Sequence, residues 1–182
     1  NFLETHAIRK GGVALNKSSG KRIKACLPMH TFGSPCRIQE ISDVCVEWDI
    51  PLVEDAAESL GSFYGNRHTG TFGLLGTISF NGNKIITTGG GGMVLTDNDQ
   101  LAKRAKHLTT TAKIPHKYEF SHDEVGFNYR LPSLNAALGC AQMEQLTRII
   151  QIKNQIAARY RSFFETIGVE MVKPLGECRT NN

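Results

Sequence analysis

Two side chains stand where the sequence favours nucleophilic or electrostatic chemistry, and the first is Lys84. It precedes Ile85 and Ile86, so its amine should lie beside apolar surroundings. An amine that is partly removed from water is more often neutral, and a neutral amine is a nucleophile. The plainer alternative is a lysine whose ammonium reaches solvent along an apolar surface, which is the commoner fate of a lysine.

The second is Asp55, which follows the apolar run at residues 51–54. A carboxylate at the end of a buried strand is costly to desolvate unless a cation or a protonated nitrogen faces it. An aspartate could also cap a following helix at this place, and the two roles are compatible.

Ser79 and a run of four glycines flank Lys84. The Ser79 hydroxyl could contact an anion, and the glycines at residues 89–92 allow the backbone to approach a ligand or another chain closely. The known nucleotide fingerprints fail, because Asn83 separates Gly82 from Lys84 and the pattern G-x-G-x-x-G does not follow. The glycines therefore indicate a close-approach loop of another kind.

Asn128 and Arg130 form a weaker polar group. They precede Pro132, which suits the first turn of a helix. Backbone N–H groups at a helix start favour anions, although an ordinary helix start explains the same residues.

Metal and hydrolase chemistry find little support. Cys26, His30 and Cys36 could be three ligands, but a fourth is not evident and the spacing matches no standard zinc pattern. The sequence has no Gly-x-Ser-x-Gly motif to anchor a hydrolase triad. We therefore expect no metal site.

The elements that must position these residues are those of an α/β domain. Residues 23–27 and 51–54 have the pattern of buried strands, and residues 36–48 between them have the period of a helix. Strand, helix and strand in this order form a βαβ unit with parallel strands. Ligands bind at the carboxyl ends of strands in open α/β sheets, so Asp55 should face a ligand.

The rest of the chain continues this alternation. We expect loops at residues 61–76 and 109–126, strands at residues 77–80 and 93–96, a helix at residues 97–108, and a long helix from Leu134 that could break near Thr147.

Composition excludes several classes of protein. The 182 residues are 40% hydrophobic and 21% charged, as in a globular domain. A net charge of +4 gives no reason to expect nucleic acid, and no apolar run is long enough to predict a membrane span. The five cysteines include no close pair and indicate reduced thiols in a cytoplasmic protein.

Four segments stand out together: VEDAAESLGS at 53–62, GTFG at 70–73, ISFNGNKIITTGGGG at 78–92 and GFNYRLPSLNAAL at 126–138. Together they resemble the DegT/DnrJ/EryC1/StrS-type sugar aminotransferases, which use pyridoxal 5'-phosphate. It implies the three-layer α/β large domain of the aspartate-aminotransferase fold (fold type I), incomplete here and followed by a long helix towards a small domain. The wording SFNGNKIITTGGGG is most similar to the branch that makes nonulosonic acids of the legionaminic type.

The resemblance implies a role for each candidate residue. Lys84 matches the lysine that binds the cofactor covalently and then shuttles protons, and Asp55 matches the carboxylate that faces the pyridine nitrogen. Ser79 matches a hydroxyl that contacts the phosphate. Asn128 matches a residue that reaches the phosphate in the neighbouring subunit, which implies a homodimer with shared sites. Glu58 stands where many relatives carry Gln or His near the cofactor's 3-hydroxyl, so it departs from the wider pattern.

The function implied is transfer of an amino group from an amino acid, expected to be glutamate, to a nucleotide-linked 4-keto sugar for surface polysaccharide or nonulosonic acid. Some relatives carry His in place of the lysine and dehydrate sugars, so Lys84 favours transamination. Three other interpretations stay open: a catalytically incomplete fragment that only dimerises, a relative of the sugar dehydratases that use the same cofactor, and a general sugar-nucleotide binder.

The resemblance also implies missing parts. Family members are about twice as long, and we find neither their amino-terminal Gly-Thr segment, which grips the phosphate, nor the aromatic ring that stacks on the cofactor. We expect residues 1–132 to be part of the large domain and residues 133–182 to be the linking helix and the start of the small domain. The chain would then be the central part of a larger enzyme.

Overall fold

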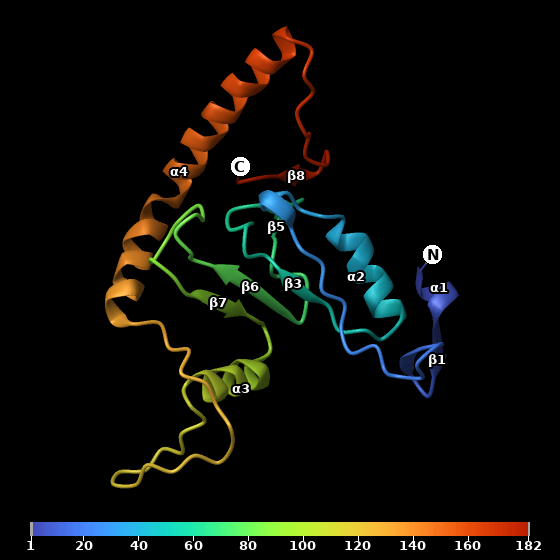
Figure 1. The fold of residues 1–182 in the computed structure, drawn as a ribbon, viewed down its shortest axis with the longest axis vertical. Helices are drawn as coiled ribbons and strands as arrows, with labels where there is room; N and C mark the ends of the chain where they lie inside the picture. The colour runs from blue at the N-terminus through green and yellow to red at the C-terminus, as the bar shows by residue number, and fades with distance from the viewer. Residues whose placement is uncertain (1, 182) are drawn as a thin grey trace.

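A three-stranded sheet lies at the centre of the molecule. The computed structural model describes residues 2–181; Asn1 and Asn182, at the outer ends of the two expected regions, lie outside the described residues. The sheet has the order β3–β6–β7, from the strands Val53–Asp55, Leu75–Ser79 and Gly92–Leu95. β3 and β6 are parallel, whereas β6 and β7 are antiparallel. Figure 1 shows α2 (Ile38–Glu47) on one side of this sheet and α4 (Ser133–Thr166) on the other.

The predicted strand at residues 23–27 is wrong, although its parallel orientation is confirmed. The segment makes isolated parallel bridges instead, which pair Cys26 with Leu52 and Met29 with Asp55. Pro28 lies between the two bridges and has no N–H to donate. The ladder beside β3 is therefore interrupted, and no continuous strand forms there.

The other predicted strands and helices along the sheet are present with shifted ends. β3, β6 and β7 correspond to the strands predicted at residues 51–54, 77–80 and 93–96. α2 and α3 (Asp99–Thr109) correspond to the helices predicted at residues 36–48 and 97–108. The Asn98 side chain caps α3 by accepting from the backbone N–H groups of Gln100 and Leu101, both at 3.0 Å.

The prediction of a loop over residues 61–76 is wrong in part. The strands β4 (Phe63–Tyr64) and β5 (Arg67–His68) form a hairpin around Gly65, whose φ of +58° suits a tight turn. β4 also pairs with β8 (Cys178–Arg179) near the end of the chain. A second hairpin, β1 (Ala7–Lys10) with β2 (Val13–Asn16), follows the short helix α1 (Phe2–His6).

The predicted break near Thr147 does not occur, because α4 is one continuous helix. Its middle packs on the core cluster of Ala56, Ile78, Phe80 and Ile86 through Leu146 and Ile149. A second cluster of Ile38, Cys45 and Leu52 lies under α2. No helix in the described part of the chain has both the length and the apolar character that crossing a bilayer requires.

The predicted loop at residues 109–126 is confirmed as irregular structure, and ion pairs tie it to α3. Arg104 forms a two-point pair with Glu124, one contact of which is 2.6 Å, and His107 Nε2 lies 2.7 Å from Asp123 Oδ1. His107, Asp123 and Glu124 thus form a cluster that could also face a metal, but Arg104 already neutralises it in part.

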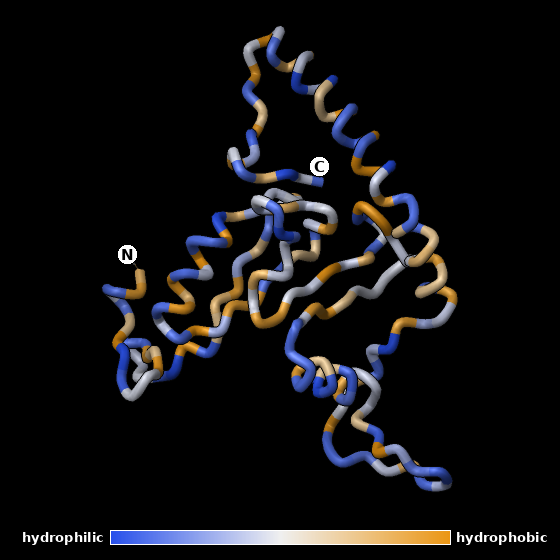
Figure 2. Tube along the Cα trace, turned by 180° about the vertical axis from the view of Figure 1, so that it is seen from behind, coloured by the Kyte–Doolittle hydropathy of each residue, from blue (hydrophilic) through white to orange (hydrophobic). Residues whose placement is uncertain are grey.

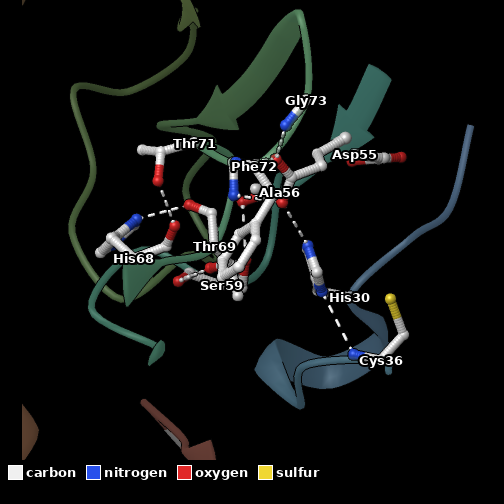
Figure 3. Close-up of polar contacts among 12 residues, drawn as sticks. His30, Cys36, Asp55, Ala56, Ser59, His68, Thr69, Thr71, Phe72 and Gly73 are labelled. Carbon is white, nitrogen blue, oxygen red and sulfur yellow. Dashed lines mark hydrogen bonds and ion pairs between the residues drawn. The ribbon is translucent and has the colours of Figure 1, made fainter. Parts of the chain in front are cut away.

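A buried carboxylate joins the sheet to the loop before β6. Glu54 is fully buried, and its Oε1 accepts from the backbone N–H groups of Phe72 (2.5 Å) and Gly73 (2.7 Å). Its Oε2 accepts from the N–H of Gly70 at 2.7 Å and lies 3.0 Å from His30 Nε2. Figure 3 shows His30 with contacts on two sides, towards the sheet and towards Cys36.

These contacts decide the ionisation of Glu54. Burial by itself would raise the pKa of Glu54, but the His30 side chain and the N–H groups of Gly73 and Gly70 outweigh it and hold the pKa below the ordinary 4.5. The folded state therefore keeps Glu54 charged. His30 holds this charge on one side, and the backbone N–H groups of the loop before β6 hold it on the other.

Gly76 should not tolerate a side chain. A Cβ at this position would overlap the carbonyl oxygen of Gly70, whereas a Cβ at Gly82 meets nothing within 4 Å. We expect Gly76→Ala to lower the free energy of unfolding by about 2 kcal/mol or more, as overpacking does. Urea unfolding, monitored by circular dichroism, measures this free energy, with Gly82→Ala as the matched control. Equal effects of the two substitutions would contradict the packing described.

Glu54→Gln should lower stability at neutral pH and remove part of its pH dependence. Because the pKa of Glu54 is lower in the folded than in the unfolded protein, its stabilisation is present above about pH 4.5 and is lost as the pH falls through the folded pKa. We expect a loss of about 2 to 4 kcal/mol at pH 7 that shrinks in acid. Urea unfolding from pH 3 to pH 7 measures it, with the exposed Glu47→Gln as control. A deficit that is the same at every pH would refute the assignment.

Candidate active site

Asp55 is the last residue of β3. It therefore lies at the carboxyl end of a parallel strand, where α/β sheets bind their ligands. It lies on the opposite face of the strand from Glu54, since neighbouring side chains alternate. The Asp55 side chain accepts from the N–H of Ala57 at 3.1 Å, so it closes a short turn. The alternative that Asp55 caps a following helix is wrong, because turns and no helix follow it.

Lys84 and Glu58 meet at this edge. Lys84 Nζ lies 3.3 Å from Glu58 Oε1, and the two side chains are 15% and 32% exposed. Lys84 belongs to the turn after β6, where its N–H donates to the carbonyl of Asn81 at 3.0 Å. Ile86, two residues on, is buried in the core and holds the turn down. The amine is thus partly enclosed and faces an acid three residues beyond Asp55.

The second oxygen of Glu58 is held by backbone. Glu58 Oε2 accepts from the N–H of Phe32 at 2.7 Å. This contact, followed by the Lys84 side chain, lowers the pKa of Glu58 below its ordinary value of 4.5. Glu58 therefore stays ionised as the partner of the Lys84 amine. Sequence reasoning placed Glu58 near this group but missed its direct contact with Lys84.

Ser79 ends β6, the strand next to β3. Asp55 pairs with Thr77 in the register of these strands, so Ser79 lies two residues further towards the same edge. Its hydroxyl is half-buried and accepts from the N–H of Asn81 at 3.3 Å. Four of the five predicted site residues, Asp55, Glu58, Ser79 and Lys84, are thus gathered at the carboxyl ends of β3 and β6.

Asn128 is not brought to this group within the chain. It is exposed and bridges to Thr110 at the end of α3. Figure 1 shows its segment, between α3 and α4, on the other side of the β6–β7 pair from the turn after β6. The ion pairs of Arg104 and His107 with the loop before it fix where this segment lies.

Two residues that sequence reasoning did not assign also shape the site. Glu54 could have been found, because an acid inside a buried strand needs a partner and His30 was already a polar candidate nearby. Asn181 carried no such signal. It is fully buried, and its side-chain N–H groups donate to the carbonyls of Glu58 and Leu60, both at 2.8 Å. The pairing of β8 with β4 brings it there.

A cavity of about 890 Å³ lies elsewhere, between the glycine run, β7 and the start of α4. Its lining includes the side chains of Met93, Tyr129, Arg130 and Asn135. Lys84, Asp55 and Glu58 are not part of that lining. This cavity is therefore separate from the cluster of Asp55, Glu58 and Lys84.

The cluster fits a cofactor that carries an aldehyde and a protonated ring nitrogen. Lys84 offers a half-enclosed amine, and Asp55 offers a carboxylate at the same sheet edge. Ser79 adds a hydroxyl, which suits a phosphate oxygen. His30, which was weighed as a metal ligand and not expected to be one, has its two ring nitrogens engaged by Glu54 and by the N–H of Cys36.

Comparison with known proteins agrees with this chemistry. Residues 13–179 match the DegT/DnrJ/EryC1/StrS aminotransferase family. The chain is 39% identical to the GDP-perosamine synthase of Vibrio cholerae over 169 residues, which are 93% of this chain and 45% of that enzyme.

Solved structures show the same fold. The aminotransferase TlmJ from Streptoalloteichus hindustanus superposes with a TM-score of 0.83 and 29% identity, over 91% of this chain and 46% of that one. Helicobacter pylori PseC, an aminotransferase involved in the biosynthesis of pseudoaminic acid, superposes with a TM-score of 0.75 and 27% identity, over 78% of this chain and 38% of that one.

The chain thus spans less than half the length of each of these relatives. The predicted fold class, a partial α/β large domain of fold type I followed by a long helix, is confirmed by the superpositions. The chain belongs to the DegT/DnrJ/EryC1/StrS aminotransferase family.

Proposed function

We propose that this chain carries the cofactor-attachment part of a nucleotide-sugar aminotransferase that uses pyridoxal 5'-phosphate. The observation that carries the proposal is the Lys84–Glu58 contact at the carboxyl end of β3, beside Asp55. A half-enclosed amine, its acid partner and a second carboxylate at one sheet edge suit the attachment of such a cofactor.

Each residue then has a distinct task. When bound, pyridoxal 5'-phosphate supplies an aldehyde and an electron-withdrawing ring. Lys84 holds the cofactor covalently and later moves a proton at its Nζ atom. Asp55 keeps a proton on the ring nitrogen, because its negative charge stabilises the protonated form. Ser79 donates its hydroxyl to the phosphate, and Glu58 orients Lys84.

The proposed substrate is a nucleotide-linked 4-keto sugar, with glutamate as the amino donor. Similarity to a GDP-perosamine synthase and to an enzyme of pseudoaminic acid biosynthesis supports a sugar substrate in the synthesis of surface polysaccharide or nonulosonic acids. The motif SFNGNKIITTGGGG supports the branch of the legionaminic type. A lysine at position 84 favours amination over the dehydration that relatives with His perform.

The proposed assembly is a homodimer in which Asn128 serves the site of the partner subunit. Asn128 bridges to Thr110 at the end of α3 and not to the Lys84 group, which supports a role in trans. Within α4, all of which is described, no residue is fully buried, and Figure 2 shows apolar residues interspersed with polar ones along it. Its most exposed large apolar residue is Leu134, at 86%. The division into a large-domain part, 1–132, and a linking part, 133–182, belongs to the same proposal.

Lys84 should be the lysine that captures the cofactor. We expect millimolar pyridoxal 5'-phosphate followed by borohydride to label Lys84 about tenfold more than the surface lysines, a preference of about 1.4 kcal/mol. Peptide mass spectrometry of the 182-residue chain measures the label at each lysine. The exposed Lys103→Arg variant should keep the preference and Lys84→Arg should abolish it. Uniform labelling of all lysines would refute the proposal. It would favour the alternative hypothesis, a fragment that only dimerises.

Dimerisation should depend on α4. We expect the chain to sediment with twice its monomer mass, and Leu134→Glu to shift it to the monomer because a charge would be buried against the partner. Analytical ultracentrifugation measures the mass, with Gln151→Glu on the same helix as control. A monomeric chain, or a Leu134→Glu variant that still dimerises, would remove α4 from the interface.

A further inference from the structure

The proposed function leaves the buried His30–Glu54 pair without a task. Both side chains are fully buried, and Glu54 immediately precedes Asp55 on β3. The backbone N–H of His30 donates to the carbonyl of Asp55 at 3.0 Å, so the pair is tied to the sheet at the residue that faces the site. Because apolar residues often pack as well as a buried polar pair, a role in addition to joining the sheet to the loop before β6 is worth seeking.

Its hydrogen bonds define the state of His30. The N–H of Cys36 donates to His30 Nδ1 at 3.2 Å, so this nitrogen is an acceptor and carries no proton. Nε2 therefore carries the proton and donates to Glu54 at 3.0 Å. His30 is thus a neutral bridge with one fixed tautomer, and it joins the loop at Cys36 to the charged carboxylate inside the sheet.

Residues 31–33, which lie between His30 and Cys36, reach the site. Phe32 has φ of 53° and ψ of 26°, a left-handed conformation that costs a non-glycine residue about 1 kcal/mol or more. Such a conformation persists where the surroundings impose it. His30 anchors the segment on one side, and on the other the hydroxyl of Ser62 donates to the carbonyl of Gly33 at 2.6 Å. In this conformation the N–H of Phe32 points to Glu58.

We propose that His30 and Glu54 form a positioning pair for Lys84, and that they act through the backbone of residues 30–33 and the carboxylate of Glu58. The connection runs from Glu54 to His30, along the strained turn to the Phe32 N–H, and through Glu58 to Lys84 Nζ. The proposal rests on the proposed function of Lys84. His30 and Glu54 are positioning residues, since neither touches the amine.

The wild-type chain provides a first test that needs no variant. If the pair holds the turn, the amide of Phe32 and the Glu54-bound amides of Gly70, Phe72 and Gly73 belong to one cooperative unit. Hydrogen exchange followed by NMR at several denaturant concentrations should give these four amides the same opening free energy and the same dependence on denaturant. A Phe32 amide that exchanges by a separate, smaller opening would overturn the proposal.

The second test uses His30→Gln, which leaves the Glu54 charge in place. If the pair acts through Phe32, this substitution should raise the pKa of Glu58 towards its ordinary value of 4.5, because the Phe32 N–H no longer holds the carboxylate. Carboxyl ¹³C NMR measures this titration in the folded chain. Glu54→Gln should act in the same direction, and Glu47→Gln on α2 should have no effect. The Phe32 amide should exchange about tenfold faster or more in both variants of the pair.

A role in stability alone would lower the free energy of unfolding and leave the Glu58 titration of the folded chain as it is, which would refute the positioning role. The double variant His30→Gln with Glu58→Gln further separates a positioning role from a role in stability alone. Its borohydride labelling at Lys84 should equal that of Glu58→Gln alone, because both changes act through one carboxylate. Additive effects would overturn the proposal. If wild-type Lys84 takes up no label, the proposed function fails, while the NMR measurements still decide the positioning role.

Discussion

The structure depends on one buried charge, the carboxylate of Glu54. Three backbone N–H groups and the Nε2–H of His30 surround it, so its desolvation is offset by four donors. The three backbone donors come from Gly70, Phe72 and Gly73, which lie just before β6. The carboxylate therefore fixes the start of β6 against β3, and the register of these two strands brings their carboxyl ends together.

This constraint positions the candidate site on the other face of the strand. Asp55 follows Glu54 directly, so the residue that should face a cofactor is carried by the strand that the buried carboxylate ties to the loop before β6. Lys84 depends on a different support, the packing of Ile86 and its neighbours against α4. Glu58 joins the two parts because it contacts Lys84 with one oxygen and the Phe32 N–H with the other.

Local pattern predicted most elements of the fold and not their exact ends. The helical period of α2 and α3 and the apolar runs of β3, β6 and β7 were sufficient, because each depends on residues close in sequence. The segment before Pro28 failed as a strand because the ring of one proline interrupts its ladder. The hairpin of β4 and β5 was missed because its strands have two residues each, too few to show a period.

The sequence by itself determined the family resemblance, the sheet-edge position of Asp55, Ser79 and Lys84, and the membership that the comparisons confirmed. Tertiary structure alone decided which side chains meet. Glu58 touches Lys84 across 26 positions of sequence, and Asn181 reaches the Glu58 backbone across 123. Such contacts leave no local pattern, because they arise from the pairing of strands and the return of the chain after α4, which depend on the whole chain being folded.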